Sequence, residues 1–188
     1  ILLMPFSMII GISNLINFLY HKKKSKIKTI CVGNIYVGGT GKTPISIEIY
    51  KILKKSKIKS VFIKKKRLSH SDEIKLLSKI GPIISLKSRI KSIEDAQRKK
   101  FKCAIFDDGL QDKLLNYDFK IVCFDKKNFI GNGKLIPAGP LRESLNSLKK
   151  YDIIFFNGLE KLEKNIISKV KKINNKLKIF ETYPIIIN

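Results

Sequence analysis

The spacing of apolar residues alternates between two patterns along most of the chain. Short apolar runs bounded by glycine, proline, asparagine or lysine predict buried strands. Between these runs, apolar residues recur at helical spacing, as at Ile45, Ile49 and Ile52 within residues 42–54. The predicted strands are 29–32, 60–63, 82–86, 103–106, 119–124, 152–156 and 179–181, and the predicted helices are 42–54, 72–77, 90–100, 141–150 and 159–173.

This alternation indicates the fold class. Strands that alternate with helices form a mostly parallel sheet with helices on both faces. The sequence therefore predicts an α/β domain, which we place at residues 29–188, a length sufficient for a sizeable core. The apolar run 183–188 ends without a following element, and the first residue is Ile1 rather than methionine. We therefore expect the chain to be a piece of a longer protein.

The first residues of the chain follow neither pattern. Residues 1–20 carry no charge and are long enough to span a bilayer. Polar or small residues nevertheless interrupt the run on one side of a helix, at Ser7, Gly11, Asn14 and Asn17. A lysine-rich collar follows, so we predict that residues 1–28 are a membrane-associating segment, an apolar helix followed by a basic collar. A helix packed on the domain itself is the alternative.

The charge of the chain narrows the choice of partner. The formal net charge is +24, and only four of the 39 basic residues are arginine. Lysine gives a diffuse, hydrated positive field, whereas nucleic-acid readers combine arginine with aromatic residues in a groove. The charge favours an anionic membrane, and we predict no nucleic-acid partner; compositional drift toward lysine explains the excess equally well. Strongly salt-dependent RNA binding would instead indicate an RNA-binding module.

The three cysteines, Cys31, Cys103 and Cys123, each lie in or beside an apolar run. They have no CxxC spacing and no histidine partner, which argues against a metal site. We expect them to be buried thiols in a reducing compartment.

The strongest chemical signal lies between the first predicted strand and helix of the domain, at Tyr36, Val37, Gly38, Gly39, Thr40, Gly41, Lys42 and Thr43. The glycines allow backbone N–H groups to curl around a phosphate, and Lys42 supplies a point charge to the outer phosphates. Thr43 offers a hydroxyl to Mg²⁺ at the helix N-terminus, where the dipole also favours an anion. Although Tyr36 replaces the first glycine of the standard pattern, this segment predicts nucleotide binding and a P-loop NTPase-like sheet.

Two adjacent carboxylates, Asp107 and Asp108, follow the predicted strand 103–106. A carboxylate at the end of a buried strand near the P-loop is where a P-loop enzyme holds Mg²⁺. Because neighbouring side chains of an extended chain point to opposite sides, one carboxylate can face the metal while the other orients Lys42 or a substrate. An ordinary Asp-Gly turn is the structural alternative.

Two further segments carry candidate chemistry. Asp72 and Glu73 follow the second strand of the domain, where a carboxylate could receive a hydroxyl proton during phosphoryl transfer. From chemistry alone, a helix cap at Ser71 or Asp72 is the stronger interpretation. Arg142 ends a stiff loop rich in glycine and proline and could contact an anionic substrate group. A rigid connection explains that loop equally well.

Taken in order, these segments resemble one family, the tetraacyldisaccharide 4′-kinases of lipid A synthesis. The resemblance covers roughly residues 5–160 and rests on Val32–Asn34 with Val37–Pro44, Asp72-Glu73, Asp107–Gln111, Gly131–Gly133 and Pro137–Glu143. It implies transfer of the ATP γ-phosphate to the 4′-hydroxyl of a tetraacyl glucosamine disaccharide 1-phosphate, giving the 1,4′-bisphosphate. It also implies an N-terminal helix, peripheral or anchored, at the cytoplasmic face of the bacterial inner membrane. No protein partner is implied.

The resemblance also implies residue roles. Asp72 matches the catalytic base of the family, and Asp107 and Asp108 match its second acidic pair, near the metal and nucleotide. With Lys42 these form the expected catalytic set, while Glu73 and Arg142 are expected to contact the substrate. The expected cofactors are ATP and Mg²⁺.

The chain departs from the family pattern in three places. Residues 63–70 lack the family's Arg-Gly-Tyr-Gly-Arg stretch, and Asp112 stands where the family has a histidine after Asp-Asp-Gly. The family's C-terminal lobe, with a histidine of the site, is absent from the sequence. A membrane-associated P-loop ATPase of the cargo-partitioning type is the alternative function, but such proteins carry a lysine where Val37 stands.

Overall fold

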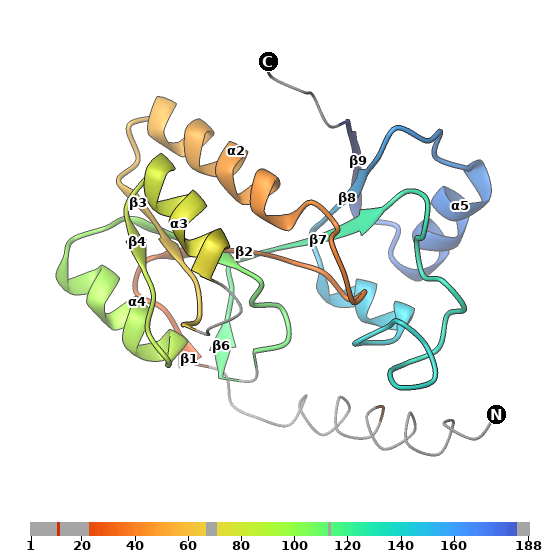
Figure 1. Cartoon of the computed structure of the whole chain (residues 1–188), viewed down its shortest axis with the longest axis horizontal. Helices are drawn as coiled ribbons and strands as arrows, with labels where there is room; N and C mark the ends of the chain where they lie inside the picture. The colour runs from red at the N-terminus through yellow and green to blue at the C-terminus, as the bar shows by residue number, and fades with distance from the viewer. Residues whose placement is uncertain (1–10, 12–22, 67–70, 113, 184–188) are drawn as a thin grey trace. The chain divides into compact units, whose positions relative to one another are not determined.

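The computed structural model describes residues 11, 23–66, 71–112 and 114–183 (Figure 1). These residues form two compact units. The N-terminal unit holds 23–33 and 42–120, and the C-terminal unit holds 34–41 and the residues from 121 onward. The helix predicted at 1–20 lies outside the described residues apart from Gly11. Among the helices that the structure does describe, none is long and apolar enough to cross a bilayer.

Four parallel strands form the sheet of the N-terminal unit, in the order β4-β3-β5-β2. The prediction of a parallel sheet alternating with helices is confirmed here. The elements are β2 (Lys28–Gly33), α2 (Lys42–Lys55), β3 (Ser60–Ile63), α3 (Ser71–Ile80), β4 (Ile83–Ile84), α4 (Arg89–Arg98) and β5 (Cys103–Asp107).

Helices cover both faces of this sheet, as the alternation of buried side chains shows. Ile63 and Phe106 face the side on which Ile93 of α4 packs. Their strand neighbours Phe62 and Ile105 face the other side and pack against α2 and α3, with Tyr50 and Leu77 as the buried residues of those helices in the cluster. Because successive strand residues point to opposite faces, strands buried on both sides read as the continuous apolar runs seen in the sequence.

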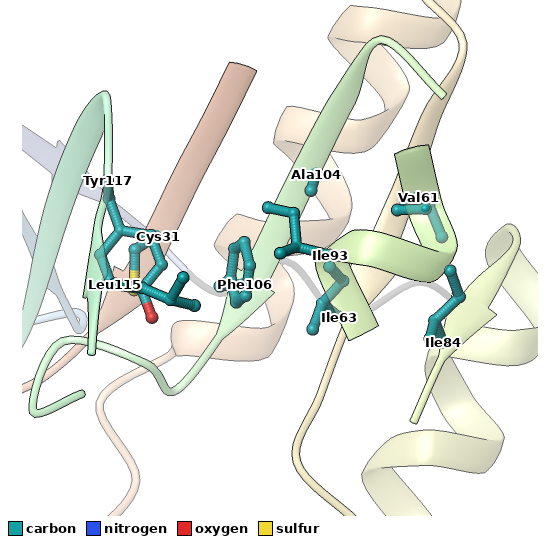
Figure 2. Close-up of a cluster of buried hydrophobic side chains, with 10 residues drawn as sticks. Cys31, Val61, Ile63, Ile84, Ile93, Ala104, Phe106, Leu115 and Tyr117 are labelled. Carbon is teal, nitrogen blue, oxygen red and sulfur yellow. The ribbon is translucent and has the colours of Figure 1, made fainter. Parts of the chain in front are cut away.

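The α4 side of the core is a continuous row of apolar contacts. Figure 2 shows this row running from Tyr117 past Phe106 to Ile84. The rings of Phe106 and Tyr117 meet edge to face with their centroids 4.9 Å apart, a favoured geometry for aromatic pairs. Tyr117 also donates a hydrogen bond from its hydroxyl to the Gly109 carbonyl at 3.1 Å. The core therefore reaches the turn that follows β5.

Two short strands of the N-terminal unit have no counterpart in the sequence prediction. β1 (Lys23–Lys24) pairs in parallel with β6 (Leu115–Asn116). Both strands have only two residues, too few for the period of their side chains to identify them. Lys23 and Lys24 belong to the predicted basic collar, and the Lys23 ammonium lies 2.8 Å from Glu94 on α4.

The C-terminal unit contains a second run of parallel strands, β7-β8-β9. Its core is aromatic: the rings of Phe124, Phe129 and Phe156 lie with centroids 5.2–5.8 Å apart. The elements are β7 (Phe119–Asp125), the 3₁₀ helix η3 (Leu145–Lys150), β8 (Ile153–Asn157), α5 (Lys164–Ile173) and β9 (Lys178–Thr182).

Two predicted helices begin later than the sequence suggested. The helix predicted at 141–150 is a 3₁₀ helix from Leu145, and the helix predicted at 159–173 begins at Lys164. In the first case the backbone has other partners. The Pro140 carbonyl accepts a hydrogen bond from the Val37 N–H at 2.8 Å, and the Arg142 N–H donates to the Ile35 carbonyl at 2.7 Å. These bonds hold the residues around Leu141 in extended form.

Burial should make the three cysteine thiols unreactive toward thiol reagents in the folded chain. Burial raises the pKa of Cys103 to about 11 and the pKa of Cys31 further, and Cys123 is also buried. Because the thiolate is the nucleophile, a thiol reagent at pH 8 should not label the folded chain but should label all three cysteines in denaturant. Labelling of the folded chain at the rate of free cysteine would show that the thiols are not buried in this core.

Candidate active site

Two buried charged residues meet where the strands of the N-terminal unit end. Asp107 is the last residue of β5, and Lys64 directly follows β3, the neighbouring strand. Both residues are only 1% exposed. Because parallel strands place their carboxyl ends on one edge, the register that pairs Ile63 with Phe106 brings the two side chains together. The Lys64 ammonium lies 2.5 Å from Asp107 Oδ2.

Asp107 is also bound by the beginning of α2. The Thr43 hydroxyl donates to its Oδ2 and the Ser46 hydroxyl donates to its Oδ1, each at 3.2 Å. Thr43 and Ser46 lie one turn apart at the start of the helix, so both side chains face the same strand. The structure therefore brings together Thr43 and Asp107, two of the predicted site residues, and Ser46 adds a contact that the sequence interpretation missed.

Lys64 links Asp107 to a second carboxylate. Its ammonium lies 2.6 Å from Glu73 Oε2 on α3. Burial by itself lowers the pKa of Lys64, but the charge of Asp107 and the hydrogen bonds that Lys64 donates to both carboxylates outweigh burial and raise that pKa above its ordinary value. Lys64 therefore stays charged, and it was not among the predicted site residues. A lysine directly after an apolar strand was the available signal.

The two adjacent carboxylates of α3 have different surroundings. Glu73 reaches the buried network through Lys64. The side chain of Asp72 is 95% exposed, with Lys75 Nζ 4.0 Å away and the Ser71 hydroxyl at 3.4 Å. The structure thus links Glu73 to Asp107 through Lys64 and leaves Asp72 open to solvent at the start of the helix.

The turn after β5 is fixed by an arginine that the sequence interpretation also missed. Asp108 has a left-handed backbone, with φ of 62°, and its N–H donates to the Val32 carbonyl at 2.8 Å. Its carbonyl accepts a hydrogen bond from Arg89 of α4, whose other nitrogen lies 3.0 Å from Asp112. Asp112 therefore orients the arginine that holds this turn.

The glycine-rich loop belongs to the C-terminal unit up to Gly41. Gly38 and Gly41 have φ of 128° and 75°, values that favour glycine. The Asn34 side chain donates to the Gly38 carbonyl at 3.1 Å and closes the loop. Tyr36 forms an isolated bridge with Leu141. The loop thus has the tight backbone curvature that suits an anion-binding turn.

The loop at 131–143 supports the glycine-rich loop through its backbone. The bonds from Val37 to Pro140 and from Arg142 to Ile35 tie the two segments together. Glu143 is 8% exposed and accepts a hydrogen bond from the Tyr151 hydroxyl at 3.2 Å. Backbone hydrogen bonds thus join this loop to the glycine-rich loop, and contact between Arg142 and a substrate stays a prediction.

The donor set of the N-terminal unit fits a hard divalent cation. Asp107 and Thr43 offer a carboxylate and a hydroxyl oxygen at the start of α2, which are ligand types of Mg²⁺ in P-loop proteins. Within the part of the chain that the structure describes, no three acidic, cysteine or histidine side chains gather into a metal site. Lys42, half-buried at the first position of α2, adds a cation at the same helix end.

Comparison with known proteins gives one consistent family. Residues 1–67 and 61–184 match the family model described as tetraacyldisaccharide-1-P 4′-kinase. The chain is 49% identical over 178 residues to a tetraacyldisaccharide 4′-kinase of Pelagibacter ubique, covering 95% of this chain and 57% of that protein. The chain is 35% identical to a Rickettsia peacockii protein of the same name, and the match covers 79% of this chain and 52% of that protein. The chain spans about half the length of these curated relatives.

Solved structures agree with this match. A crystal structure of LpxK from Aquifex aeolicus in complex with ATP has a TM-score of 0.71 and 25% identity, covering 97% of this chain and 80% of that one. The hydrogenase maturation factor HypB from Archaeoglobus fulgidus has a TM-score of 0.58 at 12% identity, covering 95% and 90% of the two chains, and shows a shared fold alone.

Replacing Lys64 tests the buried network. Lys64→Met keeps much of the side-chain volume but leaves Asp107 buried without its cation. We expect a loss of about 3–5 kcal/mol in the free energy of unfolding, measured by urea denaturation. Lys66→Met, at an exposed position two residues further on, is the control and should change stability by less than about 0.5 kcal/mol. Equal effects of the two substitutions would contradict the network.

Proposed function

The chain belongs to the tetraacyldisaccharide-1-P 4′-kinase family, and on that premise we propose that it forms the phosphoryl-transfer lobe of such an enzyme. The reaction moves the γ-phosphate of ATP to the 4′-hydroxyl of a tetraacyl glucosamine disaccharide 1-phosphate. The observation that carries the proposal is the contact of Thr43 with Asp107 where the glycine-rich loop enters α2. The relative from Aquifex aeolicus was crystallised with ATP, which supports ATP as the donor here.

Nucleotide binding falls to the glycine-rich loop and the start of α2. Backbone N–H groups of residues 36–41 would surround the phosphates, and Lys42 would neutralise the outer ones. Thr43 and Asp107 would hold Mg²⁺, with Asp108 near the nucleotide. When bound, Mg²⁺ neutralises charge that develops on the transferring phosphoryl group. The ammonium of Lys64 lies against the Asp107 carboxylate and orients it for this role.

Proton transfer falls to Asp72 in this proposal. A general base must come within hydrogen-bond reach of the hydroxyl whose proton it accepts. The Asp72 carboxylate is exposed, so a bulky lipid-linked sugar can reach it. The neighbouring Glu73 is tied to Lys64 and through it to Asp107. This chain of ion pairs fixes the start of α3 with respect to the carboxylate proposed to hold the metal. Contacts of Glu73 and Arg142 with the sugar or its phosphate complete the proposed substrate site.

The substrate places the enzyme at a membrane. An acylated disaccharide stays in the bilayer, so the site must work at its surface. The uncharged run at 1–20 and the lysines after it are suited to the anionic cytoplasmic face of the inner membrane, as a peripheral or an anchored segment. The ATPase of the cargo-partitioning type is disfavoured by the family match and by Val37.

Asp72→Asn tests the proposed base. In the protein at the length of its curated relatives, kcat for phosphate transfer to the lipid disaccharide should fall about 10²–10⁴-fold, because the hydroxyl proton loses its acceptor. The dissociation constant for ATP should stay unchanged. Glu94→Gln removes a carboxylate from α4 and is the control, which should leave kcat within about twofold. Full activity of the Asp72 variant would exclude this role.

Vesicle binding tests the membrane proposal. The chain should bind phosphatidylglycerol vesicles and lose binding as salt is raised, while neutral vesicles bind it weakly. Changing Lys22, Lys24 and Lys26 to glutamine should weaken binding by roughly tenfold or more, since each lysine near an anionic surface contributes. The control changes three exposed lysines of α5, Lys164, Lys169 and Lys172. Equal weakening by both sets would argue for a diffuse charge effect and against the collar.

A further inference from the structure

Asn157, the last residue of β8, connects the glycine-rich loop to two strand ends. Its side-chain N–H donates to the Thr40 carbonyl at 2.5 Å. Its side-chain oxygen accepts a hydrogen bond from the Thr182 hydroxyl at the end of β9. All three residues belong to the C-terminal unit. The amide therefore uses both of its ends, one on the loop and one on the neighbouring strand.

The Thr40 carbonyl fixes which end of the amide faces the loop, and the Thr182 hydroxyl satisfies the other end. The Thr40 carbonyl can only accept a hydrogen bond, so the amide nitrogen must point toward it. In the reversed orientation, the Asn157 oxygen would oppose the Thr40 oxygen without a proton between them. The hydroxyl of Thr182 supplies the proton that the Asn157 oxygen needs. The network therefore admits one orientation of the amide.

Holding the Thr40 carbonyl also aims the next N–H. The Thr40 carbonyl and the Gly41 N–H belong to one peptide, and in a trans peptide these groups point in opposite directions. The Gly41 N–H consequently points away from Asn157. Gly41 is the residue before Lys42, at the point where the loop enters the helix. In loops of this kind, N–H groups at that point bind phosphate oxygens.

Gly41 and Asn157 fit each other closely. A Cβ atom on Gly41 would lie 2.6 Å from Asn157 Nδ2, a distance that no unstrained side chain tolerates. The φ of 75° at Gly41 independently favours glycine. The loop can thus adopt its bent backbone with the Asn157 amide directly against it.

We infer that Asn157 is a positioning residue for nucleotide phosphate: it anchors the Thr40 carbonyl, so that the Gly41 N–H is presented to the phosphate, and Thr182 orients it. The inference rests on the proposed function, since it assumes that the loop binds a nucleotide. Without the anchor the Thr40–Gly41 peptide can rotate, and the N–H is presented only part of the time. Affinity for the phosphates then falls in proportion to the fraction of molecules whose loop is in the binding conformation.

The test compares the affinity of variants for ATP with Mg²⁺, measured by isothermal titration calorimetry, with their melting temperatures. Asn157→Ala should weaken ATP binding about tenfold, because an anchoring hydrogen bond to the loop is lost. Asn157→Asp should weaken it more, since a carboxylate of the same shape cannot donate to Thr40 and adds negative charge near the phosphates. Thr182→Val should have a smaller effect in the same direction, because the amide loses only its orienting partner.

Asn174 provides a matched control in the same unit. Its side-chain N–H groups donate to the carbonyls of Leu148 and Tyr151 at 2.9 and 3.2 Å, away from the loop. Asn174→Ala should lower the melting temperature but leave the ATP dissociation constant within about twofold. In the protein at the length of its relatives, Asn157→Ala should raise KM for ATP and leave KM for the lipid unchanged.

The outcomes separate the inference from the proposed function. If the unaltered chain binds no ATP, the proposed function fails, and the inference falls with it. If the unaltered chain binds ATP and Asn157→Ala binds it equally well, the inference alone is overturned. Equal losses of affinity in Asn157→Ala and Asn174→Ala would also overturn it, because they would reflect a general weakening of the fold. Should Asn157→Asp fail to fold, the alanine variant still decides.

Discussion

A carboxylate as deeply buried as Asp107 is stable there only if a cation and hydrogen-bond donors surround it. Two segments that are distant from Asp107 in sequence meet this requirement: Lys64 after β3, and Thr43 with Ser46 from α2. Breaking the ion pair would leave an uncompensated charge in the sheet edge. The strand order β3-β5 and the position of α2 are therefore tied to a single side chain, the one proposed to hold the metal.

The same ion pair extends to the chemistry proposed for α3. Lys64 has a second partner in Glu73, so the start of α3 is held near Asp107 while Asp72 remains open to solvent. A buried pair thus fixes the backbone, and an exposed neighbour is left for reaction with a large substrate. On the other side of β5, Arg89 performs a comparable structural task by bonding to the carbonyl of Asp108.

The sequence predicted the parts of this arrangement that depend on local pattern. Apolar runs marked the strands, and the sequence named Thr43 and Asp107 as candidate site residues, which the structure brings into contact. Lys64 could not be assigned, because its partner is determined by the pairing of β3 with β5, which no local pattern encodes. Asn157 is a single asparagine after an apolar strand, and its contact with Thr40 spans 117 residues. The helix expected at 141–150 failed because backbone bonds to the loop replaced helical ones.

Burial of Lys64 and Asp107 has a consequence for how the protein responds to ionic strength. Dissolved ions screen charges that water can reach, and they hardly act on a pair that is 1% exposed. The net charge of +24 is carried largely by lysines that repel one another, and that repulsion does fade as salt is added. Added salt therefore weakens the repulsion among the exposed lysines but leaves the buried ion pair almost unchanged. The attraction between Lys64 and Asp107 at the sheet edge should persist at high salt concentration.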